Sequence, residues 1–358
     1  MLDRKTAKTA RKIVQPLLFP EHSRLSWNDR RADLLEIAEP ILKSPAFLRL
    51  GNVTFLGILS PRFSRLVDSP IRSLRESRFG NDDGTRLDHS LGVAVILLDL
   101  CRRFNWSDEA KRYCVAWGLL HDIATWPLSH TGEAAFSKLT GTKSRQLRTQ
   151  IITASQELPS TLCLSKALHE IGVDGQILLH LFEENPSSLS EGLLQIWQIV
   201  HSPMTPDSLE GIWRSGAAFG TPLLHPGEVL EAIVPTLYEP VVSRRGSKDV
   251  ISFWRTKSTI YRRFINNPKV VRWESAWSLA LIRDFKNIDL AESLRLKEMD
   301  IIKVVLERGL PDDVSLVRYK APLDYSVEPA RKRVFKTDES VSKLDQTLQK
   351  RRRKDIRP

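Results

Sequence analysis

The chain has 358 residues, 41% of them hydrophobic and 27% charged, and this ordinary globular composition excludes full disorder and collagen-like or low-complexity structure. A chain of this length can bury a core without disulfide bonds or a structural metal. Its net charge of +11 resembles that of a nucleic-acid-binding protein, but residues 1–12 carry +4 and residues 331–358 carry +7, which leaves residues 13–330 neutral. The basic ends predict either non-specific contact with nucleic-acid phosphates or a solvated, disordered tail.

Neither a membrane span nor a secretory signal is predicted. The longest apolar stretch, residues 91–101, carries Asp99 and is too short to cross a bilayer. The first residues include basic side chains but no apolar core of a signal peptide. The three cysteines, Cys101, Cys114 and Cys163, form no CxxC pair, which favours a reducing compartment over a disulfide framework. We therefore expect a cytoplasmic protein that does not bind membranes.

Apolar residues recur at helical spacing along most of the chain. Residues 30–50 predict a helix that is interrupted by Pro40 and Pro45. A polar turn at residues 81–84 comes before residues 88–104, which are apolar on nearly all sides. That pattern predicts a central helix buried all round.

A second buried helix is predicted at residues 108–122, where Ser107 is a typical N-cap. Further helices are predicted, in chain order, near residues 131–139, 145–157, 160–171, 174–184, 190–200 and 206–217. Residues 228–310 predict a second helical group, and residues 314–319 predict a short strand. The expected fold class is all-α, with few short strands and a polar segment from about residue 328.

Each of the two buried helices carries a histidine. His89 lies near the start of the first, and His121 is followed directly by Asp122 at the end of the second. A buried imidazole needs hydrogen-bond partners, and a buried carboxylate needs a counter-charge. A bound divalent ion satisfies both, and this donor set suits Mn, Fe, Zn, Ni or Mg. The alternative is a histidine satisfied within the core and an ordinary helix-end aspartate.

The residues around both histidines carry a resemblance to a known family. The chain has RLDHSLGV at residues 86–93 and LLHDIATWPLSH at residues 119–130. These segments resemble the HD-domain metal-dependent phosphohydrolases, and most closely the deoxynucleoside-triphosphate triphosphohydrolase branch. The family's last ligand is an aspartate in a D-x-x-[DE] helix, and residues 204–211, MTPDSLEG, are similar to it with Asp207 in that place. Asp207 alone is equally typical of a helix N-cap.

The resemblance covers about residues 30–270. It implies a metal site formed by His89, His121, Asp122 and Asp207. Together with the basic ends, which lie outside the resemblance, it leads us to expect four segments in the chain. These are a basic N-terminal segment (1–29), an HD domain (30–225), a C-terminal helical lobe (226–327) and a basic, mobile tail (328–358).

The chain departs from the family pattern where the family carries out catalysis. The family's second histidine in H-D-x-G-H is Thr125 here, and a threonine cannot exchange a proton near neutral pH. A further catalytic histidine of the family has no counterpart in residues 142–148. The family's lysine, tyrosine and aspartate that grip the triphosphate and sugar fall on Ser208, Gly211 and Ser215. The resemblance therefore implies a retained metal shell and altered substrate contacts.

The remaining polar residues of these motifs suggest roles beside the metal. Arg86 is one turn before His89 and is expected to bind phosphate and offset transition-state charge, or else to pair on the surface with Asp82 or Asp83.

Asp122 would orient the attacking water, and Thr125 would line the phosphate pocket. His130 would act as a general acid, or else cap a helix. Arg145 or Arg148 would bind phosphate. His169, His180 and His201 stand outside any motif, and we expect ordinary surface or core roles for them or a second metal.

Three functions follow from these observations. The first is a metal-dependent phosphohydrolase that acts on a nucleotide or related phosphoester. The second is a catalytically degenerate HD module that binds a nucleotide, nucleic acid through the basic ends, or a protein partner. The third is a di-iron oxygenase of the same fold. The resemblance also implies a homo-oligomer, because relatives of this branch commonly assemble.

Overall fold

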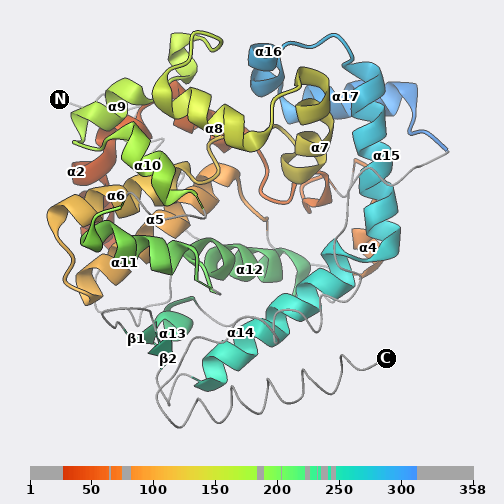
Figure 1. Ribbon diagram of the computed structural model, residues 1–358. Helices are drawn as coiled ribbons and strands as arrows, with labels where there is room; N and C mark the ends of the chain where they lie inside the picture. Colours follow the sequence, from red (N-terminus) through yellow and green to blue (C-terminus); the bar gives the residue numbers. More distant parts are fainter. Residues whose placement is uncertain are drawn as a thin grey trace, which may run out of the picture.

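The computed structural model describes residues 27–63, 66–74, 82–183, 189–202, 204–221, 226–231, 233–234, 241–242 and 247–312. Nearly all of the described regular structure is helical, which confirms the predicted all-α fold class (Figure 1). The basic ends and the predicted strand at residues 314–319 lie outside the described residues.

The helices follow one another with short connections. The α-helices are α2 (Trp27–Leu42), α3 (Pro45–Leu48), α4 (Ile71–Leu74), α5 (Arg86–Arg103), α6 (Asp108–Leu120), α7 (Ser129–Thr140), α8 (Ser144–Thr153), α9 (Ser165–Glu170), α10 (Gly175–Leu181), α11 (Glu191–Val200), α12 (Pro206–Phe219), α13 (Pro226–Glu231), α14 (Ser247–Ile260), α15 (Pro268–Asp284), α16 (Leu290–Arg295) and α17 (Glu298–Arg308). Short 3-10 turns are η1 (Arg49–Asn52), η2 (Gly57–Leu59) and η3 (Ser160–Leu162), and η4 (Tyr261–Ile265) is a π-helical turn. Strands β1 (Ile233–Val234) and β2 (Val241–Val242) pair antiparallel.

Both prolines of the first predicted helix act as expected. Pro45 starts α3 behind the N-cap Ser44, whose side chain accepts a hydrogen bond from the Phe47 amide. Pro40 lies inside α2, and the backbone leaves helical geometry at Ala38. The helix predicted at residues 160–171 is instead η3 followed by α9, because Cys163 is extended between them.

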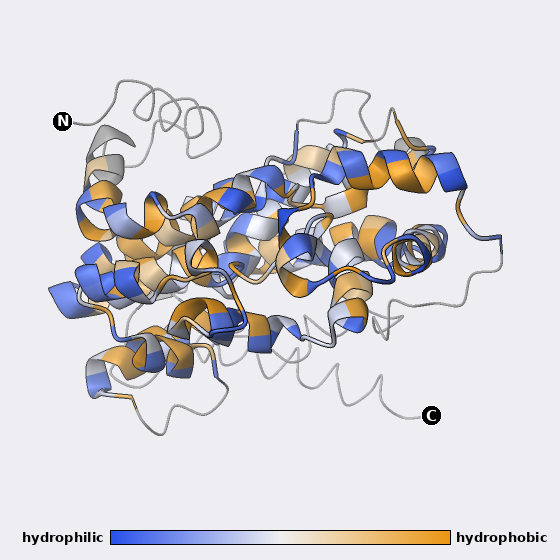
Figure 2. Cartoon of the chain, turned by 90° about the horizontal axis from the view of Figure 1, so that it is seen from above, coloured by the Kyte–Doolittle hydropathy of each residue, from blue (hydrophilic) through white to orange (hydrophobic). Residues whose placement is uncertain are grey.

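Helices α5 and α6 form the centre of the core, as their apolar sequences predicted. Thr85 and Asp88 form a capping box at the start of α5, and Ser107 caps α6. The two helices cross closely at Gly118, where an added Cβ would lie 2.7 Å from the Cα of Ala94. Figure 2 shows hydrophilic and hydrophobic residues along most other helices, as expected where one side is buried. None of the described helices is long and apolar enough to cross a membrane.

The C-terminal helices pack on the turn that follows α6. Helix α15 lies against α7 and α17 (Figure 1). Trp126 donates its indole N–H to Ser293, and Thr131 donates its hydroxyl to Glu274. One continuous apolar core includes residues of the helices up to α12 and of the C-terminal helices α14 to α17. The predicted boundary between residues 225 and 226 stays a prediction.

Glu298 is the main polar link between the two groups. Its side chain is buried, and it accepts hydrogen bonds from the amides of Thr54 (3.1 Å) and Leu128 (2.6 Å). Burial raises the pKa of this carboxyl group, although the bonded donors oppose the rise. We expect Glu298→Ala to lower the free energy of unfolding by about 3 kcal/mol, because two buried N–H groups lose their acceptor. Chemical denaturation measures this loss.

The matched control is Glu307→Ala, which removes an exposed carboxylate from the same helix. It should leave the free energy of unfolding unchanged within about 0.5 kcal/mol. Equal stability of the two variants would contradict the role given to Glu298.

Candidate metal centre

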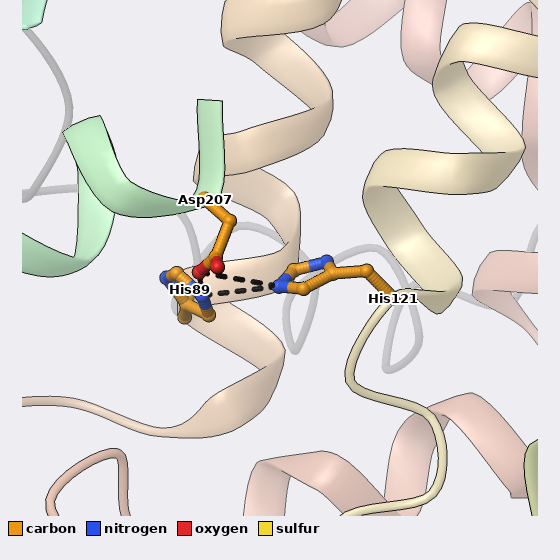
Figure 3. Close-up of side chains that lie close together, drawn as sticks. All are labelled: His89, His121 and Asp207. Atoms are coloured by element: carbon orange, nitrogen blue, oxygen red, sulfur yellow. Dashed lines mark hydrogen bonds and ion pairs between the residues drawn. The ribbon is translucent and has the colours of Figure 1, made fainter. Parts of the chain in front are cut away.

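Three helix ends bring the predicted ligands together (Figure 3). His89 lies one turn into α5, His121 is the C-cap of α6, and Asp207 lies in the first turn of α12. Helix α12 begins at Pro206 behind the N-cap Thr205, so Asp207 is not itself the cap. Its carboxylate is therefore available to the histidines.

The ligand atoms face one another at short distances. His89 Nε2 lies 3.1 Å from His121 Nε2 and 3.0 Å from Asp207 Oδ1. His121 Nε2 lies 3.8 Å from the same aspartate oxygen. Asp122 Oδ2 lies 3.8 Å from His89 Nε2 and 3.7 Å from His121 Nε2. The structure thus brings all four predicted ligands to one place.

The outer hydrogen bonds of the two imidazoles fix where their lone pairs point. His121 Nδ1 donates to the Gly118 carbonyl at 2.8 Å, and His89 Nδ1 donates to the buried carboxylate of Glu210. Each neutral ring then turns an unprotonated Nε2 towards the other and towards Asp207. Three acceptors at this distance need a positive charge between them.

Without a metal, a proton on His89 supplies that charge. Burial alone lowers the pKa of His89, but Glu210, Asp207 and Asp122 together raise it to about 9. Burial lowers the pKa of His121, which keeps that ring neutral. A divalent ion can replace the proton, because two imidazole nitrogens and two carboxylates are the donors that Mn, Fe, Zn and Ni accept. The residues present therefore fit a metal.

Glu210 is a site residue that the sequence analysis did not single out. It lies one turn after Asp207 on α12, is fully buried, and pairs with Arg214. Gly92 makes room for it, since an added Cβ there would lie 2.7 Å from Glu210 Cγ. Two features of the sequence could have identified Glu210. It is the last residue of the D-x-x-[DE] pattern, and the glycine of HSLGV is Gly92. A carboxylate that fixes a ligating histidine raises the basicity of that ligand.

Arg86 lies beside Asp122 and not on the surface. It is 5% exposed, its Nη1 donates to Asp122 Oδ2 at 2.7 Å, and its Nε donates to Ser129 at 3.0 Å. Burial alone would raise the pKa of Asp122, but Arg86 and the two histidines hold it well below its usual range. The alternative pairing of Arg86 with Asp82 or Asp83 is absent from the contacts that the described residues make.

His130 stands at the solvent side of Arg86. Its side chain is 60% exposed, with Nε2 3.5 Å from Arg86 Nη2 and Nδ1 3.5 Å from the carboxylate of Glu133. The hydrogen bond from His130 is the main influence that lowers the pKa of Glu133, and Ser144 adds a second. His130 is thus an imidazole held by a carboxylate at the edge of the ligand cluster.

Neither Arg145 nor Thr125 makes a side-chain contact with the ligands among the described residues. Arg145 is 77% exposed and pairs with Glu183 at 2.7 Å. The residue one turn later, Arg148, is closer, because its Nη2 donates to the His121 carbonyl at 2.8 Å. Thr125 is half-buried in the turn after Asp122. Their predicted roles in substrate binding stay predictions.

Two arginines hold the turn that carries His121 and Asp122. Arg148 binds the carbonyl of His121 from one side. Arg49, from η1, donates to the carbonyls of Thr125 (2.7 Å) and Ile123. Burial lowers the pKa of Arg49 only to about 10, so it remains charged at neutral pH. The turn has no helical hydrogen bonds for these carbonyls, and the arginines supply them.

A lysine from the C-terminal helices reaches the start of α12. Lys257 on α14 is buried, and its Nζ donates to Ser208 Oγ at 3.1 Å, next to Asp207. In the resembled family this position, Ser208 here, carries a lysine. The tertiary structure brings the positive charge of Lys257 beside Ser208.

The other histidines form no second centre in the described residues. His201 bonds the Leu181 carbonyl and stacks on Trp197, and His180 lies near Glu183. His89, His121 and Asp207 are the one group of three or more metal-type ligands within the described parts of the chain.

Part of the chain matches the model of a known family, and this part ends before Asp207. The HD domain family model matches residues 86–197, a range that includes His89, His121 and Asp122. HD domains bind divalent metals. No curated protein matches the chain significantly.

Solved structures with this fold include a phosphohydrolase from Bacteroides thetaiotaomicron and a hypothetical protein from Aquifex aeolicus. The first has a TM-score of 0.51 and 16% identity, over 69% of this chain and 54% of its own. The second has a TM-score of 0.57 and 18% identity, over 76% of this chain and 68% of its own. The chain thus spans about half the length of the Bacteroides protein. At these identities the likeness establishes the fold.

We expect the chain, purified without a metal-affinity tag, to contain about one divalent ion when the four ligands act together. His121→Ala and Asp207→Ala should each lose that ion, which elemental mass spectrometry measures. His169→Ala, which removes an exposed histidine on α9, should keep it. Equal metal content in all four proteins would contradict the assignment.

Glu210→Gln should weaken Mn²⁺ binding about tenfold. The variant removes the negative charge of Glu210, and the hydrogen bond of His89 to that carboxylate is what makes His89 a strong ligand. Isothermal titration calorimetry measures the dissociation constant. Glu191→Gln, at an exposed position on α11, is the control and should bind as the wild type does. An unchanged constant in Glu210→Gln would show that its carboxylate does not tune the ligand.

Proposed function

We propose that the chain is a metal-dependent phosphohydrolase that acts on a nucleotide or a related phosphoester. One observation carries this proposal. His89, His121 and Asp207 form one compact group of ligand atoms, and Asp122 lies beside the two histidines with Arg86 against it. A divalent ion bound there supplies a Lewis acid that polarises a phosphoryl oxygen and lowers the pKa of a bound water.

Arg86 is placed to bind the phosphoryl group. Its guanidinium pairs with Asp122, and it has several N–H donors for a planar, two-point contact. If Asp122 held a cation, the Arg86 guanidinium would be able to share its N–H donors between Asp122 and a phosphoryl oxygen. The positive charge of Arg86 then offsets the negative charge that grows in the transition state. Asp122 would also orient the attacking water.

His130 is the residue suited to move a proton. Its ring is exposed, so a substrate can reach Nε2, and Glu133 holds Nδ1. An imidazole nitrogen can carry a proton and donate it to a leaving oxygen. This arrangement supplies a general acid where Thr125 replaces the histidine of the resembled family.

The charges near the ligands favour an anionic substrate. Arg148 and Lys257 each approach a segment that carries a ligand, from two different helices. The resemblance to triphosphohydrolases supports a nucleotide. Ser208, Gly211 and Ser215 lack the family's triphosphate contacts, so the proposal extends to phosphoesters generally. A cytoplasmic location and a homo-oligomer stay predictions.

Asp122→Asn should abolish phosphate release in a screen of nucleoside mono-, di- and triphosphates with Mn²⁺, because the variant loses a ligand and the orientation of the water. His130→Gln should lower the rate about 100-fold and flatten its pH dependence. Released phosphate, measured by a colorimetric assay, reports both effects.

The control is Asp300→Asn, which changes an exposed aspartate on α17 and should leave the rate unchanged. Thermal unfolding confirms that each variant is folded. Full activity in Asp122→Asn would refute the proposed site.

A binding module without hydrolysis is the second candidate. The threonine at position 125 favours it, because one proton-transfer residue of the resembled family is missing. It predicts a nucleotide or nucleic acid that binds without turnover. Removal of residues 331–358 would then weaken nucleic-acid binding, and binding would fall steeply with salt.

A further inference from the structure

The ring of the ligand His121 ends a row of stacked side chains. Trp117, one helical turn earlier on α6, lies 5.5 Å from it between ring centres, with 12° between the planes. Phe182, the C-cap of α10, also stacks with Trp117, at 5.5 Å between ring centres and with 23° between the planes. The guanidinium of Arg148 lies 4.6 Å from the centre of the Phe182 ring.

A hydrogen bond to the backbone joins the two ends of this row. Arg148 Nη2 donates to the carbonyl of His121 at 2.8 Å, so the residue at one end of the row binds the residue at the other. The members come from α6, α8 and the end of α10. Because each contact restrains the next, none of the four side chains can turn without breaking a stacking contact or this hydrogen bond.

His121 needs this support because of its place in the chain. It is the C-cap of α6, where the carbonyls of the last turn have no helical partner and helix ends fray. Arg148 satisfies one of these carbonyls and places a positive charge at the negative end of the helix dipole. The Gly118 bond fixes the tautomer of His121, but a single bond at Nδ1 leaves the ring free to rotate about it. The Trp117 face fixes the ring plane.

We propose that Phe182 and Arg148 are positioning residues for the metal ligand His121: Phe182 acts through Trp117, and Arg148 acts both on Phe182 and directly on the His121 carbonyl. The proposal rests on the metal site of the proposed function. It assigns Arg148 a structural task at the ligand, distinct from the phosphate binding first expected of residues 142–148. It also predicts that Trp117, in contact with a ligand ring, reports metal binding directly.

The first test measures Mn²⁺ affinity on the full chain, with free Mn²⁺ counted by electron paramagnetic resonance. Phe182→Leu keeps an apolar side chain but removes the flat face between Arg148 and Trp117. It should raise the dissociation constant about tenfold, as the loss of an outer-shell support does. Arg148→Gln should do the same, and it tests the row if Phe182→Leu fails to fold.

The matched control is Phe104→Leu, which removes a ring from the edge contact with Trp106 at the far end of α5. Phe104→Leu should lose similar stability in thermal unfolding while it binds Mn²⁺ as the wild type does. If Phe182→Leu and Arg148→Gln also bind with wild-type affinity, the proposed positioning is wrong.

A spectroscopic test separates positioning from mere stability. Bound Mn²⁺ should quench part of the tryptophan emission of the wild type and of Phe104→Leu. Trp117→Phe keeps a stacked ring but removes the fluorophore, and the Nε1 that it deletes has no hydrogen-bond partner in the described residues. This variant should keep its affinity within about threefold and lose the quenching. Quenching that persists in full would overturn the role of Trp117.

The outcomes also separate this proposal from the proposed function. A wild type that binds Mn²⁺ but releases no phosphate from any substrate refutes only the phosphohydrolase. A wild type that binds no Mn²⁺ refutes the metal site and the positioning role together.

Discussion

Three acceptor atoms that face one another set the main physical constraint on this molecule. His89 Nε2 lies within hydrogen-bond distance of His121 Nε2 and of a carboxylate oxygen of Asp207, and both histidines are buried while Asp207 is half-exposed. Such a cluster is stable only with a positive charge at its centre. Glu210 and the Gly118 carbonyl keep both outer nitrogens protonated, so the inner lone pairs stay turned towards that charge.

The surrounding structure can be understood as support for that cluster. Arg214 balances the buried charge of Glu210, and Arg86 balances Asp122. Arg49 and Arg148 bind the carbonyls of the turn after α6, where the helix can no longer do so. Cations inside a protein are costly unless they are paired or bonded, and each of these four arginines donates to an acceptor close by.

Much of the helical core and the ligand set could be predicted from local patterns. The apolar sequences of α5 and α6, the cap Ser107 and the two prolines of the first predicted helix act within a few residues of their own positions. The ligands followed from the resemblance of two short motifs. Glu210 and Arg49 were missed as site residues, because their partners lie 121 and 74–76 residues away in sequence.

The sequence by itself determined the all-α class, the buried central helices and the residue types of a metal site. These depend on periodicity, capping and side-chain chemistry, which act locally. Only the tertiary structure decided which charge meets which partner. It buried Arg86 against Asp122, left Arg145 exposed, brought Lys257 to Ser208, and stacked Phe182 between Trp117 and Arg148. Such contacts join helices far apart in the chain, and no local pattern encodes the packing that brings them together.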